Sequence, residues 1–261
     1  MHPTRIQRLF ENLKHQRRAA LIAYLTAGDP TPERTPDLVA ALERGGVDLV
    51  ELGVPFSDPI ADGPVIQAAA ERALKAGTTV AGVLEIARRI RQRSEIPLLL
   101  FTYLNPVLRY GLDKLAGDAK AAEIDGCLLT DVSVEEAEPF VRAMRAAGLD
   151  TVFLAAPTST EARLKLVAQY STGFVYLVSR TGVTGVRAAL SESLEPLVRK
   201  VRAATSLPLA AGFGISTPEQ ANEAAKMADG VVVGSAIVRL IEQGASLEKL
   251  EAFAQSLAAG M

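Results

Sequence analysis

An acidic residue, Glu51, interrupts an apolar run of this sequence: Leu49 and Val50 precede it, and Leu52 to Val54 follow it. An ionised glutamate inside a buried strand is costly unless a cation pairs with it or its pKa shifts. A salt bridge within the fold is the simpler explanation, but the apolar runs of this chain contain no lysine or arginine, and Arg180 follows its own run. We therefore predict that Glu51 is an acid/base group with a raised pKa.

Two more carboxylates follow in the same stretch, ELGVPFSDPIADGP, which begins at Glu51 and ends at Pro64. Asp62 lies in a proline-rich loop, and we expect this loop setting to keep it charged. Asp58 stands between Ser57 and Pro59, and we expect it to be structural or part of a moving loop. Two carboxylates whose surroundings separate their pKa values can divide the roles of acid and charge stabiliser.

Other polar side chains follow later apolar runs. These are Tyr103, Asn105, Asp131, Tyr176 and Arg180. Two of them also have ordinary structural explanations, because Tyr176 suits a core aromatic position and Asp131 could cap a helix near Val134.

Histidine and lysine offer little chemistry in this sequence. His2 and His15 fall in an N-terminal helical pattern, and the lysines fall in predicted helices or their flanks. A histidine-rich metal site and a Schiff base on a strand are therefore disfavoured. Carboxylates and phenols remain as the candidate acids and bases.

Glycine-rich segments near the C-terminus predict a phosphate site. GFGIS contains Gly212 and Gly214, and GSAIV contains Gly234 and Ser235. Backbone N–H groups in such loops and at a helix start can bind phosphate, although loop glycines are more often only turn formers. A third segment, SRTGVTG, has the composition of a mobile lid that includes Arg180.

About eight short apolar runs, separated by amphipathic helical patterns, must position these residues. Continuous apolar strands that each lead into a helix indicate a parallel sheet covered on both faces. We predict one α/β domain over residues 1–261, a (β/α)8 TIM barrel, with an extra N-terminal helix that plugs its bottom and a short phosphate-site helix after strand 8. An open doubly wound sheet is the alternative, but TAGDPTPE lacks the glycine fingerprint expected after its first strand.

The overall composition disfavours nucleic acid and membranes as binding partners. A net charge of -2 gives no basic face for nucleic acid or an anionic membrane, and no apolar run reaches the ~18 residues that span a bilayer. The only cysteine, Cys127, stands beside leucines, which suits a core position and a reducing compartment. We expect a cytoplasmic protein that binds small molecules or other proteins.

The motifs ELGVPFSDPIADGP, TAGDP, YLVSRTGVTG, GFGIS and GSAIV, in this order, closely resemble those of tryptophan synthase alpha subunits. The resemblance implies a lyase of tryptophan biosynthesis that cleaves indole-3-glycerol phosphate to indole and glyceraldehyde 3-phosphate and needs no cofactor of its own. It also implies an alpha2-beta2 complex with a beta subunit that carries pyridoxal phosphate. A stand-alone lyase, a regulatory subunit that activates a partner, and a phosphosugar isomerase on the same scaffold remain alternatives.

The resemblance also assigns residues. Glu51 matches the acid/base carboxylate, Asp62 the carboxylate that meets the indole nitrogen, and Tyr176 a tyrosine that supports Glu51. The phosphate-binding positions match Gly185, Gly214, Gly234 and Ser235, and the substrate pocket matches Tyr24, Phe101, Leu128, Thr184 and Phe213. The sequence departs from the family pattern at Ser133, where proline is usual, and matches it only approximately from Asn105 to Tyr110, near the expected beta-subunit contact.

These residues suit a cleavage in which indole is its own electron sink. Once C3 is protonated, the ring nitrogen becomes iminium-like and the bond to the glycerol chain weakens. We expect Glu51 to transfer the protons while Asp62 stays ionised against the N–H, and the loops 55–62 and 180–185 to order together when phosphate binds.

Overall fold

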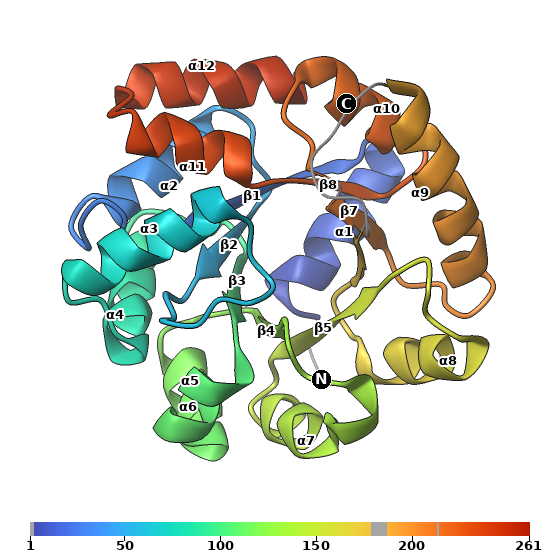
Figure 1. The fold of residues 1–261 in the computed structure, drawn as a ribbon, viewed down its shortest axis with the longest axis horizontal. Helices are drawn as coiled ribbons and strands as arrows, with labels where there is room; N and C mark the ends of the chain where they lie inside the picture. Colours follow the sequence, from blue (N-terminus) through green and yellow to red (C-terminus); the bar gives the residue numbers. More distant parts are fainter. Residues whose placement is uncertain (1–2, 179–186, 213) are drawn as a thin grey trace.

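The structure is a computed structural model that describes residues 3–178, 187–212 and 214–261. Its eight described strands form a closed parallel barrel in the order β1 to β8 (Figure 1). The strands are β1 Ala20–Thr26, β2 Leu49–Gly53, β3 Leu98–Thr102, β4 Gly126–Leu129, β5 Asp150–Ala155, β6 Val175–Val178, β7 Leu209–Gly212 and β8 Gly230–Val233. The predicted barrel is confirmed.

Helices surround the strands, and one turn of 3-10 helix, η1 Val134–Glu136, precedes α7. The helices are α1 Arg5–Gln16, α2 Thr35–Arg44, α3 Pro64–Lys75, α4 Val80–Arg91, α5 Leu104–Tyr110, α6 Leu112–Ala121, α7 Glu138–Ala146, α8 Glu161–Tyr170, α9 Arg187–Arg202, α10 Pro218–Ala225, α11 Ser235–Glu242 and α12 Leu247–Ala258. Within the described ranges, no helix is both long and apolar enough to cross a membrane.

Alternate strand residues face the barrel interior or the helices, because the side-chain period of a strand is two. On β1, Ile22 belongs to the interior cluster and Leu21 to the outer cluster. On β2, Leu49 faces the interior and Val50 the helices. The same alternation directs Glu51 into the barrel. Cys127 is buried in the outer cluster, as its neighbours predicted.

Helix α1 closes the N-terminal end of the barrel, as predicted. Thr4 caps it: the Thr4 hydroxyl accepts from Gln7 N–H at 3.1 Å, and Gln7 Oε1 accepts from Thr4 N–H at 3.2 Å. Ile6 and Phe10 are buried in the interior cluster, with the Phe10 and Phe174 rings 5.6 Å apart. Beyond this buried face, His15 lies in the last turn, and His2 lies outside the described residues.

The N-terminal rim of the barrel joins its strands in pairs through a repeated contact, which we call the strand latch. In each latch, a residue just before an even-numbered strand donates its N–H to a carbonyl of the preceding odd-numbered strand, at 2.8 to 2.9 Å. Its side-chain oxygen accepts the N–H of that same odd-strand residue, at 2.7 to 3.0 Å. The four latches join Asp48 to Leu21, Asp125 to Leu98, Thr172 to Thr151, and Asp229 to Leu209.

Arginines neutralise the three acidic latches. Arg18 pairs with Asp48, Arg91 with Asp125, and Arg202 with Asp229. In the remaining latch the acceptor is the neutral Thr172. The three latch carboxylates are therefore fixed by strand N–H groups and by arginines, which suits the stabilising role of the N-terminal face in this fold.

Candidate active site

Glu51 is fully buried in the barrel interior at the centre of β2. Neither carboxylate oxygen of Glu51 has a hydrogen-bond partner among the described residues. No described arginine or lysine forms an ion pair with Glu51. Burial raises the pKa of Glu51 to about 8. The side chain is therefore protonated at neutral pH and can donate a proton to a bound molecule.

Aromatic rings lie beside Glu51 in the interior. Tyr24 is its register partner on β1, and the Tyr24 and Phe101 rings meet edge to face at 5.1 Å between centroids. Phe101 also lies 6.4 Å from the Tyr176 ring. Leu128, on β4, belongs to the same interior cluster as Tyr176. These side chains form an apolar wall suited to an aromatic substrate.

Tyr176 is a close neighbour of Glu51 without a hydrogen bond to it. Burial raises the pKa of the Tyr176 hydroxyl well above its ordinary value, and the Glu51 charge, followed by Tyr24, raises it further. Because the Glu51 oxygens accept no hydrogen bond from Tyr176, any support that Tyr176 gives in this state comes from packing and electrostatics.

Two strand-end glycines make room for the tyrosines. A Cβ at Gly53 would lie 2.3 Å from the Tyr24 hydroxyl oxygen, and a Cβ at Gly212 would lie 2.3 Å from Cε1 of Tyr176. Real Cβ atoms do not approach neighbours so closely. Gly212, which the sequence suggested for phosphate, therefore has a packing role beside Tyr176 in the structure.

Asp62 lies half-buried in the loop that connects β2 to α3. Its Oδ2 accepts a hydrogen bond from the Tyr103 hydroxyl at 2.9 Å. Burial raises the pKa of Asp62 to about 6, while the Tyr103 hydrogen bond opposes the rise. The loop setting is thus partly buried, and it raises the pKa of Asp62 above the ordinary value of 3.8. Asp62 is nevertheless mostly ionised at neutral pH.

Tyr103 was a candidate in the sequence, but its contact with the loop that carries Asp62 was not predicted. Only 3 % of it is exposed, and its hydroxyl also accepts from Ala61 N–H at 3.0 Å, so it holds the loop on both sides of the Ala61–Asp62 peptide. Its ring packs 5.3 Å from that of Phe56. A buried tyrosine at a strand end needs a partner for its hydroxyl, and this signal could have pointed to the loop.

The predicted phosphate positions Gly214, Gly234 and Ser235 lie at the C-terminal ends of β7 and β8. Gly214 has a φ of +69°, which favours glycine, and Gly234 is the residue before α11, which begins at Ser235. Among the described residues no side chain caps α11, so its first N–H groups are available there to an anion. A Cβ at Gly234 would lie 3.4 Å from Tyr24 Cβ, which places this helix start beside the aromatic wall. Arg180, Thr184, Gly185 and Phe213 lie outside the described residues.

Comparison with known proteins shows the family of this chain. The family model described as tryptophan synthase alpha chain matches residues 10–260. The chain belongs to this family. It is 71% identical to the tryptophan synthase alpha chain of Solibacter usitatus, over 98% of both chains, and 51% identical to that of Geotalea uraniireducens, over 99% of this chain and 98% of the relative.

Solved tryptophan synthase structures share the fold. The alpha subunit from Legionella pneumophila str. Paris superposes with a TM-score of 0.92 at 38% identity, covering 99% of this chain and 98% of that one. A chain of Mycobacterium tuberculosis tryptophan synthase gives 0.92 at 39% identity, with 99% and 98% covered. The resemblance drawn from the motifs is confirmed.

Two other acidic candidates have structural contacts away from Glu51 and Asp62. Asp131 Oδ1 accepts from Leu104 N–H at 2.7 Å, so it caps the start of α5. The suggested capping of the turn near Val134 was wrong, because the neighbouring helix start offers the free N–H. Asp58 is exposed and accepts from the Ser57 hydroxyl at 2.5 Å, which agrees with a structural role.

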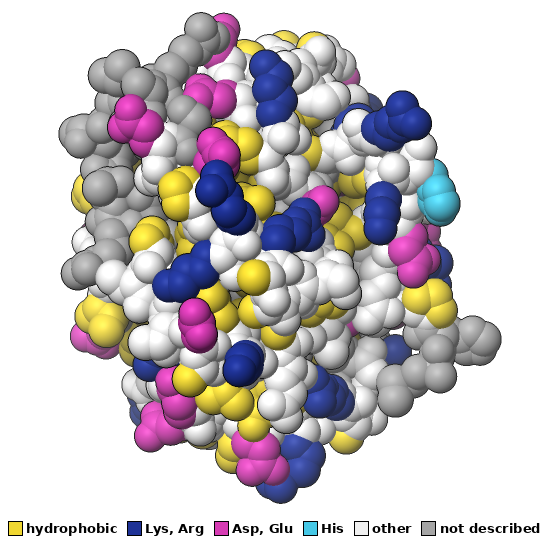
Figure 2. All heavy atoms as spheres, turned by 90° about the vertical axis from the view of Figure 1, so that its right-hand side faces the viewer, with side chains coloured by type: hydrophobic (Ala, Val, Ile, Leu, Met, Phe, Trp, Pro, Cys, Tyr) yellow, Lys and Arg dark blue, Asp and Glu magenta, His cyan; other side chains and the backbone are white. Residues whose placement is uncertain are grey.

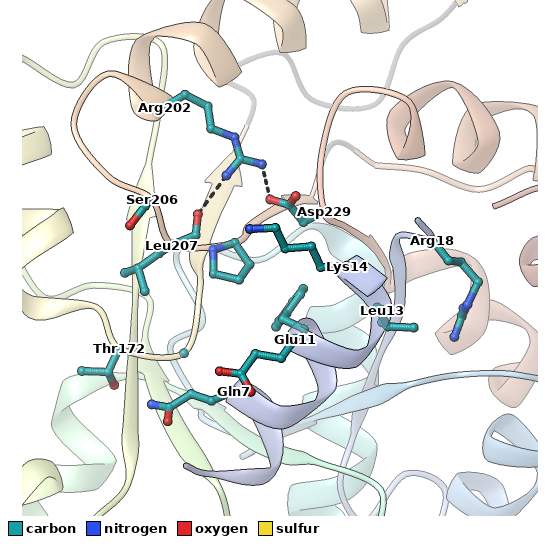
Figure 3. A pocket seen from close by; sticks show the side chains of 13 residues that line it. Gln7, Glu11, Leu13, Lys14, Arg18, Thr172, Arg202, Ser206, Leu207 and Asp229 are labelled. Carbon is teal, nitrogen blue, oxygen red and sulfur yellow. Dashed lines mark hydrogen bonds and ion pairs between the residues drawn. The ribbon is translucent and has the colours of Figure 1, made fainter. Parts of the chain in front are cut away.

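A groove of about 580 Å³ lies at the opposite end of the barrel, between α1 and the segments that enter β6 and β7. Figure 3 shows Glu11 and Lys14 reaching into it from α1, opposite the paired Arg202 and Asp229. Cationic and anionic side chains are also intermixed on the face drawn in Figure 2. The groove has neither an unpaired buried carboxylate nor the aromatic wall, so the C-terminal end is the candidate active site.

Proposed function

We propose that this chain cleaves indole-3-glycerol phosphate to indole and glyceraldehyde 3-phosphate, as the alpha subunit of a tryptophan synthase. The observation that carries the proposal is Glu51, a buried carboxyl group beside an aromatic wall, with a pKa of about 8 and no hydrogen-bond partner in the part of the chain that the structure describes. Asp62, with a pKa of about 6, supplies the second carboxylate. At neutral pH one group holds a proton and the other a negative charge, as the reaction requires.

In the proposed reaction, Glu51 gives its proton to C3 of the indole ring. Asp62 stabilises the positive charge that then develops at the ring nitrogen. The substrate hydroxyl on the carbon next to the ring loses its proton to the Glu51 carboxylate, and its O–H electrons form the aldehyde C=O. The bond between that carbon and C3 breaks, and its electrons restore the aromatic ring. Glu51 ends protonated, so no cofactor is consumed.

In this proposal the substrate binds with its indole ring at one end of the pocket and its phosphate at the other. Tyr24, Phe101 and Leu128 contact the indole ring, and Tyr176 packs beside Glu51. The phosphate meets backbone N–H groups at Gly214, Gly234 and Ser235. Thr184, Gly185 and Phe213 complete the site on the family pattern, and loops 55–62 and 180–185, including Arg180, close over the bound substrate.

We also infer that a beta subunit carrying pyridoxal phosphate docks on the C-terminal face, in an alpha2-beta2 complex. Exposed apolar residues on this face support the inference, since Leu108 is 55% exposed and Ile60 is 84% exposed. A depression of about 160 Å³ lies beside Leu108, with Leu104, Val132 and Phe140 among its lining residues. We expect one barrel domain acting in the cytoplasm.

The test is indole release from indole-3-glycerol phosphate by the purified chain, with and without a tryptophan synthase beta subunit. Slow release that the partner strongly accelerates is the expected result. Fast release that the partner leaves unchanged would instead indicate a stand-alone lyase. No release under either condition would overturn the proposed reaction and favour a purely regulatory subunit or an isomerase.

A further inference from the structure

Arg72 joins three elements behind the candidate active site. Its Nε donates to Asp29 Oδ1 and its Nη2 to Asp29 Oδ2, both at 2.8 Å. Its Nη1 donates to Glu242 Oε1, also at 2.8 Å. Arg72 lies in the last turn of α3, Asp29 follows β1, and Glu242 ends α11. One guanidinium thus connects α3, α11 and the loop after β1.

The two helices that Arg72 connects lead to the two ends of the proposed pocket. Helix α3 begins at Pro64, two residues after Asp62, and α11 begins at Ser235, a proposed phosphate position. The helices pack side by side (Figure 1). Buried Ala69 of α3 and Val238 of α11 share an apolar cluster with Tyr24. The carboxylate loop and the phosphate helix are therefore mounted on one packed pair.

Helix α3 packs closely against the loop that follows β1. Asp29 is only 2% exposed, and the Arg72 side chain that pairs with it through two hydrogen bonds is 30% exposed. Gly28 has a φ of +89°, and a Cβ there would lie 1.9 Å from the Thr78 hydroxyl oxygen, just beyond the end of α3. The loop thus fixes the far end of α3 against the barrel.

We infer that Arg72 is a positioning residue that sets the distance between Asp62 and the phosphate-binding start of α11. A substrate that carries an indole ring at one end and a phosphate at the other must meet both groups at once. Small errors in such spacing reduce the rate strongly, with about 1 Å costing as much as ~100-fold. Binding of either end alone does not depend on the spacing. The inference rests on the proposed function.

The test is Arg72→Lys in the full chain. Lysine keeps a positive charge beside Asp29 but lacks the planar fork that holds two carboxylates together. We expect kcat/KM for indole-3-glycerol phosphate to fall by about tenfold to a hundredfold. The Kd values of indole alone and of glycerol phosphate alone should each change by less than about twofold, since neither fragment spans both ends.

Arg44→Lys is the matched control, because Arg44 also joins two helices, α2 and α12, through an ion pair with Glu251 at 2.8 Å. Neither of those helices carries a proposed site residue, so kcat/KM should be unchanged. Glu242→Gln tests the α11 link while leaving the Asp29 pair intact, and should lower kcat/KM in the same direction by a smaller factor.

Two results would overturn the inference: an unchanged kcat/KM in Arg72→Lys, or fragment affinities that weaken in parallel with kcat/KM, as general damage would cause. The spacing is also measurable without turnover, as the Kd of indole-3-glycerol phosphate in Glu51→Gln with and without Arg72→Lys. This Kd should rise when Arg72 is replaced, and an unchanged value would contradict the spacing role. Failure of the unmodified chain to release indole would overturn the proposed reaction separately.

Discussion

The latch carboxylates at the N-terminal rim and the two carboxylates of the candidate active site are held in opposite ways. At the N-terminal rim, Asp48, Asp125 and Asp229 accept strand N–H groups and pair with arginines. At the C-terminal end, Glu51 has no partner among the described residues, and Asp62 accepts from a single tyrosine hydroxyl. Partners, more than burial alone, therefore separate acids that hold the barrel together from acids that are kept available for chemistry.

The largest expected effect is loss of turnover in Glu51→Gln. Glutamine keeps the shape of the side chain but cannot exchange a proton, so kcat should fall by at least ~10²- to 10⁴-fold. Substrate affinity should be retained, as measured by calorimetry. Glu85→Gln is the matched control, because Glu85 forms an exposed ion pair with Arg88 on α4, which carries no proposed site residue. Turnover like that of the unmodified chain in Glu51→Gln would remove Glu51 from the mechanism.

At the other end, Asp125→Ala should destabilise the fold without changing the chemistry. The side chains of Arg91 and Asp125 are each 4% exposed, so the variant leaves a buried cation with a broken latch. We expect a loss of about 3–5 kcal/mol in the free energy of unfolding, measured with denaturant. Glu85→Ala, at the exposed ion pair with Arg88, should cost less than about 1 kcal/mol. Equal losses in the two variants would contradict the role of the latch.

The sequence alone predicted the barrel, the unusual position of Glu51 and the family. The continuous apolar runs, each leading into a helical pattern, indicated the barrel. Glu51 stood out because the apolar runs contained no cation, and the motifs indicated the family. Contacts between distant segments could not be predicted. Tyr103 and Asp62 are 41 residues apart, and their hydrogen bond depends on how the loop folds back over the barrel. The latches likewise depend on strand register, which no single segment specifies.

Glu51 should also make stability depend on pH. Its pKa rises from 4.5 in the unfolded chain to about 8 in the fold. The folded state therefore binds the extra proton between these values, and stability falls as pH rises through them. Glu51→Gln lacks this loss. Between pH 4.5 and pH 8, the free energy of unfolding of the variant, relative to that of the unmodified chain, should therefore rise by on the order of a few kcal/mol.

Denaturant unfolding across this pH range measures the difference. The glutamine amide does not titrate, so its burial adds the same free energy at every pH. Comparing how the difference in unfolding free energy changes with pH therefore cancels this constant. A difference that stays flat from pH 4 to pH 9 would show that Glu51 titrates normally in the fold.

The smallest expected effect belongs to Tyr103→Phe. In the unmodified chain, kcat/KM should rise with pH as Asp62 ionises near 6 and fall as Glu51 ionises near 8. Loss of the Tyr103 hydroxyl removes a hydrogen bond that lowers the pKa of Asp62. The acid limb should therefore move to higher pH, with a rate loss of only a few-fold at pH 7, while the alkaline limb stays in place. A shift of both limbs would contradict the separate roles of the two carboxylates.

The most direct test of the account is the protonation state of Glu51 in the folded chain. Carboxyl-carbon NMR on protein labelled with ¹³C-glutamate, with Glu51→Gln used to assign the signal, follows this group through a pH titration. We predict a neutral carboxylic acid at pH 7 with a midpoint near 8. An ionised Glu51 at pH 7, with a midpoint near the ordinary value of 4.5, would contradict the central claim that the C-terminal end keeps one of its carboxyl groups protonated for chemistry.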